Sequence, residues 1–234
     1  MHLLRLSVAS YLTLAAIFLT SAGAVPVTTC GQTVDGQGEL TADLDCSATT
    51  GPAVIVQPGS RLELSGFTLL ANDTGVQCAV GRCTIVGPGT IRRAAGPANQ
   101  QQGILGLYKA TVLNVILDNW PIAVSVLGPT DVRGCTIQNS GIGVLGERTR
   151  VADSSFSNNG IGVYGSEATP SGVHFGIKYI FWSVRIARTT FTGNTIDIAS
   201  FRRPIVNDST CTTSDMLHLV PDQFMGGDEW NVCS

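Results

Sequence analysis

A repeat of about 19 residues constrains this chain more than any other feature of its sequence. Within residues 131–163 one arrangement of apolar and amide side chains occurs twice. Its positions are Val132, Ile137, Asn139, Ile142 and Val144, and then Val151, Phe156, Asn158, Ile161 and Val163. The same frame is found upstream at 112–124, downstream at 186–198 after an insertion, and in weaker copies at Leu64/Leu69 and Val86/Ile91. A period near this length predicts stacked structural repeats.

Each repeat predicts short β-strands joined by tight turns. Its apolar residues come in pairs two positions apart, such as Ile142 and Val144, separated by Gly, Asn, Ser and Asp. That spacing places alternate side chains on one face of a strand, and the separating residues favour turns. Stacking the repeats about 4.8 Å apart buries apolar columns that a single repeat cannot bury. We therefore predict an all-β, single-stranded parallel β-helix of about six to seven coils.

Three asparagines occupy the same place in successive repeats. Asn119, Asn139 and Asn158 each follow an inward apolar residue by two positions. Stacked amides in a turn can hydrogen-bond to one another along such a column. The expected role of these residues is a turn ladder rather than a ligand site.

The patterns Gly-Ile-x-Val and Val-x4-Ile/Phe-x-Asn resemble those of the pectin-lyase-like superfamily of parallel β-helix proteins. The resemblance covers about residues 50–206 and implies a right-handed coil. That family includes pectate lyases, polygalacturonases and alginate-modifying enzymes, so the resemblance also implies a polysaccharide as substrate or ligand. The shared pattern is specific for the fold and does not identify an activity.

The first residues and the cysteines together indicate export. Residues 1–24 combine Arg5, the apolar stretch 12–19 and an Ala-x-Ala motif at 22–24, as in a secretory signal peptide. In an oxidising compartment, cysteines that are neighbours in sequence are expected to form disulfides. The predicted pairs are Cys30–Cys46, Cys78–Cys83 and Cys211–Cys233, with Cys135 left over. Sequence alone leaves other pairings open. No metal site is expected, because His is scarce and no Cys-x2-Cys motif occurs.

The repeat divides the mature chain into three parts. The ends of a solenoid expose apolar side chains and strand edges, so each end needs a cover. We expect an N-terminal cap at 25–50, the β-helix at 51–205 and a C-terminal cap at 206–234, both caps being closed by disulfides. A loop at about 166–182 interrupts the helix.

That loop gathers aromatic side chains in a chain that has few of them. Insertions in solenoids often lie on the binding face, and aromatic rings beside polar groups suit stacking on sugars. The alternative is that the rings pack the loop onto the rod. The ligand-binding candidates are Tyr164, His174, Tyr179, Phe181 and Trp182.

The flat face predicted beside Val124, Val144, Val163 and Ile198 lacks the residues of a polysaccharide-cleaving site. Asp197 is the one carboxylate among the eight expected outward positions of that face. Glycoside hydrolysis needs two carboxyl groups about 5–9.5 Å apart, and a calcium site needs several acidic oxygens. The sequence motifs of polygalacturonases and alginate epimerases are also absent.

A second strand carries more charge. Asp131, Arg150 and Arg185 share one predicted column, and Asp153 and Arg188 share another. Ion pairs Asp131–Arg150 and Asp153–Arg188 are one interpretation. The other is a β-elimination site with an arginine base, which makes Arg150, Asp153, Arg185 and Arg188 the catalytic candidates.

These observations favour a binding protein over an enzyme. Charged residues are 13% of the chain, the net charge is −3, and no basic run indicates a nucleic-acid partner. We expect a secreted, monomeric, non-catalytic protein that binds polysaccharide or another extracellular surface, without cofactor and without membrane contact once the leader is removed. The alternative is a divergent polysaccharide lyase or glycoside hydrolase of the pectin-lyase-like superfamily.

Overall fold

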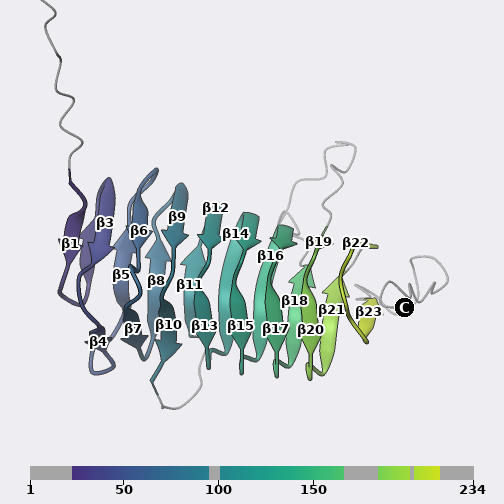
Figure 1. Cartoon of the computed structure of the whole chain (residues 1–234). Helices are drawn as coiled ribbons and strands as arrows, with labels where there is room; N and C mark the ends of the chain where they lie inside the picture. Colours follow the sequence, from purple (N-terminus) through teal and green to yellow (C-terminus); the bar gives the residue numbers. More distant parts are fainter. Residues whose placement is uncertain (1–22, 95–100, 166–183, 201–202, 217–234) are drawn as a thin grey trace, which may run out of the picture.

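The chain folds into a parallel β-solenoid of about seven turns, as the repeat predicts (Figure 1). The computed structural model describes residues 23–94, 101–165, 184–200 and 203–216. Among these residues there is no α-helix, and hence no helix with the length and apolar character needed to cross a membrane.

Strands of successive turns stack into three parallel columns. The first column consists of β2 (Gln32–Val34), β5 (Pro52–Val56), β8 (Thr74–Cys78), β11 (Gln102–Gly106), the first halves of β14 (Ile122–Arg133) and β16 (Ile142–Ala152), β18 (Ile161–Gly165), β21 (Ile196–Ser200) and β23 (Ser214–Met216). The second consists of β1 (Val25–Val27), β3 (Gln37–Leu40), β6 (Arg61–Glu63), β9 (Arg82–Val86), β12 (Lys109–Leu113), the second halves of β14 and β16, β19 (Arg185–Ala187) and β22 (Ile205–Asn207). The third consists of β4 (Leu44–Cys46), β7 (Thr68–Ala71), β10 (Thr90–Arg93), β13 (Ile116–Asp118), β15 (Thr136–Gln138), β17 (Ser155–Ser157) and β20 (Thr190–Thr192).

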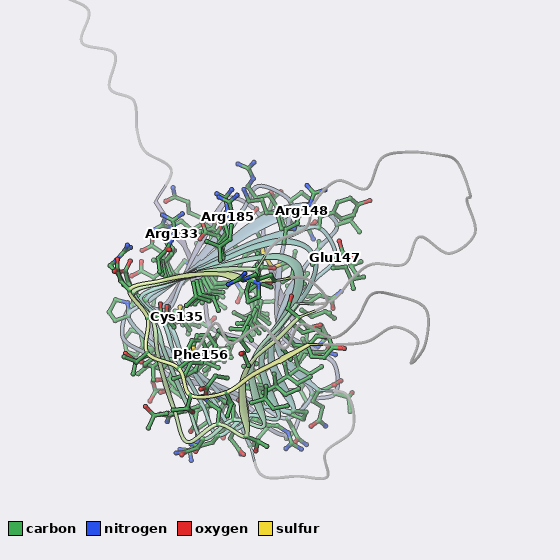
Figure 2. All side chains as sticks on the ribbon, turned by 90° about the vertical axis from the view of Figure 1, so that its right-hand side faces the viewer. Arg133, Cys135, Glu147, Arg148, Phe156 and Arg185 are labelled. Carbon is green, nitrogen blue, oxygen red and sulfur yellow. A yellow bond between two sulfur atoms is a disulfide. The ribbon has the colours of Figure 1, made fainter. Side chains whose placement is uncertain are left out.

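The predicted repeat register is confirmed in the central turns. Val132 stacks on Val151, and Ile137 stacks on Phe156, which in turn stacks on Phe191 with ring centroids 5.0 Å apart. All of these side chains are buried, because alternate residues of each strand point into the solenoid. Figure 2 looks along the stack and shows Phe156 and Cys135 inside it.

In the two weaker copies the second-strand position was predicted one or two residues too late, whereas Leu69 and Ile91 stack as predicted. Val112 stacks on Ile85, not Val86, and Ile85 stacks on Leu62, not Leu64. In these turns a longer corner separates the second strand from the third. It contains Ser65 and Gly66 with φ of 51° and 89° in one turn, and the cis Gly87–Pro88 bond in the next. A fixed count of residues between inward positions therefore fails there.

Regular stacking begins inside the segment predicted as the N-terminal cap. Strands β2, β3 and β4 pair in parallel with β5, β6 and β7 and so form a complete turn. At the open end, Gln32 occupies the inward place of Val54, and its side chain bonds to Thr28 N (3.0 Å) and Pro26 O (2.8 Å). The Cys30–Cys46 disulfide fastens residues 25–31 to this first turn.

The two disulfides predicted within the described part of the chain are confirmed. Cys30–Cys46 lies at the N-terminal end, whereas Cys78–Cys83 joins two strands of one turn within the solenoid. Cys211 is also disulfide-bonded, and its predicted partner Cys233 lies outside the described residues. Cys135 is free and buried, and burial raises the pKa of its thiol to about 11, so it packs as an inert apolar group.

The predicted Asn ladder lies one residue further along. Asn119, Asn139 and Asn158 adopt left-handed backbone conformations, which Asn tolerates better than most residues. Their amides do not form the expected column: Asn139 donates to Asp118 Oδ1 (2.7 Å). The amide ladder is instead buried at Asn159, whose Nδ2 donates to Asn194 Oδ1 (3.0 Å) and whose Oδ1 accepts from Ser140 N (2.9 Å).

Candidate binding surface

The outward face of the second column concentrates positive charge. Strand alternation places its cations in two rows, one and three residues before the inward apolar side chain of each turn. Two further positions, one and two residues after the inward side chain, supply Arg133 and Arg188. Together they form the basic face: Arg61, Arg82, Lys109, Arg133, Arg148, Arg150, Arg185 and Arg188. These are eight of the 14 Lys and Arg residues in a chain whose net charge is −3. In Figure 2, Arg133, Arg148 and Arg185 point away from the solenoid on the same side.

Register brings these cations together from distant parts of the sequence. Arg82 stacks on Lys109, and Arg150 stacks on Arg185, each pair one turn apart. The step between stacked strands is about 4.8 Å. Like charges at that spacing repel one another and gain no stability from the pairing. For Arg82 and Lys109 the described part of the chain provides no ion pair that offsets this repulsion.

The acidic groups of this face are engaged by nearby side chains. Arg61 pairs with Glu63 (2.8 Å), Arg133 pairs with Asp131 (2.7 Å), and Glu39 accepts a bond from Ser65 (2.7 Å). Within the described part of the chain, Arg82, Lys109 and Arg150 form no ion pair. These three guanidinium and ammonium groups are therefore available to an anionic partner.

The four catalytic candidates do lie near one another. Arg150 and Arg185 are neighbours in register, and Arg188 makes two bonds to Asp153, at 2.5 and 2.8 Å. This ion pair confirms one predicted contact. The other predicted pair was wrong: Asp131 is beside Arg150 in register, but its carboxylate bonds to Arg133 on its own strand, where two residues' separation lets the guanidinium fork reach both oxygens.

This geometry opposes a role for Arg188 as base. The bonds to Asp153 and its negative charge raise the pKa of Arg188, and Asp131 raises that of Arg133 in the same way. The bonds from Arg188 in turn lower the pKa of Asp153. A base must lose its proton to act, and both arginines hold theirs more firmly than a free guanidinium does.

The flat face predicted beside Val124, Val144, Val163 and Ile198 presents other side chains than expected. Ala123, Gly143, Gly162 and Asp197 do not point outward but are buried at a tight corner, where a side chain on Gly143 would lie 2.4 Å from Gly162 O. Asp197 takes this place in the turn of β21, and its carboxylate accepts bonds from Thr212 N (2.7 Å) and Thr213 N (3.1 Å). It ties this turn to the segment that leads into β23.

Of the predicted ligand-binding residues, only Tyr164 can be placed. It lies half-buried on β18, beside Leu145 and Ala199 on the neighbouring turns of the first column. His174, Tyr179, Phe181 and Trp182, with the rest of the loop 166–182, lie outside the described residues. Their part in binding stays a prediction.

One carboxyl group that sequence reasoning missed is perturbed. Glu147 lies where β16 bends from the first column into the second, it is 8% exposed, and burial raises its pKa while Arg148 opposes the shift. Figure 2 places it on the edge beside Arg148. In the described part of the chain no three acidic, His or Cys side chains gather as a metal site would require.

Comparison of the chain with protein families, with curated proteins and with solved structures gave no match. The surface itself must therefore carry the functional argument.

Proposed function

We propose that this protein is a secreted, non-catalytic solenoid that binds acidic polysaccharide through its basic face. The observation that carries the proposal is the row of cations contributed by successive turns to one outward sheet. Arg82, Lys109 and Arg150, which lack acidic partners in the described chain, form its centre. A polymer with a carboxylate or sulfate on each unit presents a matching row of negative charge.

The rigid sheet favours a linear ligand that lies along the rod. Each turn advances the surface by about 4.8 Å, and a cation occurs on most turns from β6 to β19. Because the strands fix the backbone, little ordering of the main chain opposes binding. Long Lys and Arg side chains can still adjust to the position of each acidic group.

The alternative, a divergent lyase or hydrolase, has less support. The guanidinium groups near Asp153 are stabilised in their charged form, and Asp153 itself is held by Arg188. Arg150 lies next to Arg185, which suits anion binding at least as well as proton abstraction. Glu147 is a single perturbed carboxyl group, whereas hydrolysis requires two.

The proposal is tested with the purified mature protein on polygalacturonate, alginate and sulfated glycans, with dextran as the neutral control. We expect retention by the acidic polymers alone, and weaker retention as salt screens the charges. The same incubations, with and without calcium, are followed for new reducing ends and unsaturated product. Equal binding to dextran would overturn the acidic ligand, and product formation would overturn the non-catalytic role.

A further inference from the structure

Exposed apolar side chains gather on one edge of the rod. The described chain has seven large hydrophobic residues with substantial exposure, and four of them lie at the corner between the first and second columns. We define these four as the apolar edge: Val80 (58% exposed), Leu107 (44%), Tyr108 (58%) and Leu127 (58%). An exposed apolar cluster of this kind marks an interaction site, whereas isolated exposed residues need no explanation.

The corners that carry the edge belong to three consecutive turns. Gly106 stacks on Cys78 in one direction and on Val126 in the other, so the segments that follow them are neighbours. Lys109 N donates to Gly81 O (3.4 Å), and a side chain on Gly128 would collide with Tyr108 O. The Cys78–Cys83 disulfide closes the corner that presents Val80. The edge is thus held at fixed spacing by the solenoid.

Cations of the basic face flank this edge. Arg82 and Lys109 directly follow the exposed corners of their turns, and Arg148 follows the corner of the turn after Leu127. Residues 79–82, 106–109 and 126–129 contain no acidic side chain. The nearest carboxyl on this edge, Glu147, is buried. The edge therefore presents apolar tips beside Arg82 and Lys109, which form no ion pair in the described part of the chain.

We propose that this edge docks on a lipid surface that carries anionic headgroups. Aliphatic tips can enter the boundary between headgroups and acyl chains, while flanking Lys and Arg side chains contact the headgroups. Tyr108 offers the amphipathic ring that is favoured at such an interface. Charge complementarity selects an anionic surface, and three aliphatic side chains at a corner suit a lipid boundary better than the flat stacking that a sugar ring requires.

This proposal goes beyond polysaccharide binding and departs from the expectation that the mature chain avoids membranes. The two surfaces adjoin, because Arg82, Lys109 and Arg148 belong to the basic face and also border the apolar edge. A membrane whose outer surface carries acidic glycan would engage both. The lipid proposal nevertheless stands without the polysaccharide proposal, since apolar residues of the edge take no part in the basic face.

Co-sedimentation with vesicles tests the proposal, using phosphatidylcholine alone and an equal mixture of phosphatidylcholine and phosphatidylglycerol. We expect the wild type to bind the mixed vesicles and not the neutral ones. The edge variant Leu107→Ser/Leu127→Ser should bind at least about tenfold more weakly, because each serine removes an aliphatic side chain from the contact. The matched control Ile116→Ser/Ile205→Ser removes two exposed aliphatic residues elsewhere (40% and 45% exposed) and should bind as the wild type does.

The outcomes separate the two proposals. Lipid docking is overturned if the wild type does not co-sediment with the mixed vesicles. It is also overturned if the control variant loses as much vesicle binding as the edge variant. Retention of the edge variant on acidic polysaccharide should equal that of the wild type. An edge variant that also loses its retention on acidic polysaccharide, while its thermal unfolding is unchanged, would overturn the separation of the two surfaces and would show that the apolar edge serves both kinds of binding.

Discussion

The second and third strand columns have the same interior and different exteriors. Inward, both present apolar side chains in register, such as Val132 on Val151 and Ile137 on Phe156. Outward, the second column carries the basic face. One outward row of the third column consists mainly of hydroxyls: Thr68, Thr90, Ile116, Thr136, Ser155 and Thr190. Stacking of the turns requires apolar side chains inside, so both columns share them. The outward side chains are not constrained by stacking, so they can differ according to function.

The largest expected effect comes from breaking the shared interior. Phe156 is fully buried and stacks on Phe191, so Phe156→Ala should lower the free energy of unfolding by about 3–5 kcal/mol. Chemical denaturation measures the change. A loss below about 1 kcal/mol would contradict the account of a continuous apolar column.

The buried amide of Asn159, on the side of the third column, should also contribute to the stability of the fold. Asn159 is 2% exposed, and its amide bonds to Ile137 O (3.1 Å), Asn194 Oδ1 and Ser140 N. Asn159→Ala removes these side-chain bonds, while Asn194 Oδ1 keeps the bond from the backbone N–H of residue 159 (2.9 Å), and should cost about 1–3 kcal/mol in chemical denaturation. Unchanged stability would show that the ladder does not hold the turns together.

Removing the buried hydroxyl of Thr149, on the side of the second column, is predicted to raise stability instead of lowering it. Thr149 is fully buried, and within the described chain its hydroxyl has no hydrogen-bond partner. Thr149→Val keeps the shape and removes the unsatisfied oxygen, so the free energy of unfolding should rise by about 1 kcal/mol. A clear loss of stability would mean that the hydroxyl is satisfied after all.

The smallest expected effect concerns Glu147 and depends on pH. Burial raises its pKa in the folded state, so the unfolded chain releases this proton first as pH increases. The group therefore lowers stability increasingly above the ordinary glutamate pKa. Glu147→Gln should raise the melting temperature at neutral pH, and the difference should vanish below that pKa. A difference that is constant with pH would point to packing instead of ionisation.

The interior was predictable from sequence because stacking imposes it on every turn. Val132 and Val151 are one repeat apart in the sequence, and their strands pair in the register that this repeat predicts. Early turns were harder, since the corner containing Gly87 and Pro88 changes the count of residues between inward positions. Stacking itself leaves the length of a corner unconstrained.

The basic face was only partly predictable from sequence, because the variable corner lengths also hide the register of the outward residues in the early turns. Arg150, Arg185 and Arg188 were identified, whereas the other five cations of the face were missed, among them Arg82 and Lys109. These two lie three residues before an inward side chain, as Arg148 does before Val151. The pattern becomes visible only when the third turn is aligned on Ile85. Burial of Glu147 could not be predicted, because it depends on how β16 bends.

Moving the same charge change between the two faces tests the central claim most directly. Arg82→Ala/Lys109→Ala/Arg150→Ala removes three positive charges from the basic face, and Thr90→Glu/Thr136→Glu/Thr190→Glu adds three negative charges to the third column. Both variants have a net charge of −6, since −3 − 3 = −6. Affinity for polygalacturonate is measured at one salt concentration. The account predicts that the first variant loses most of its affinity and the second little; equal losses would mean that net charge, and not the basic face, governs binding.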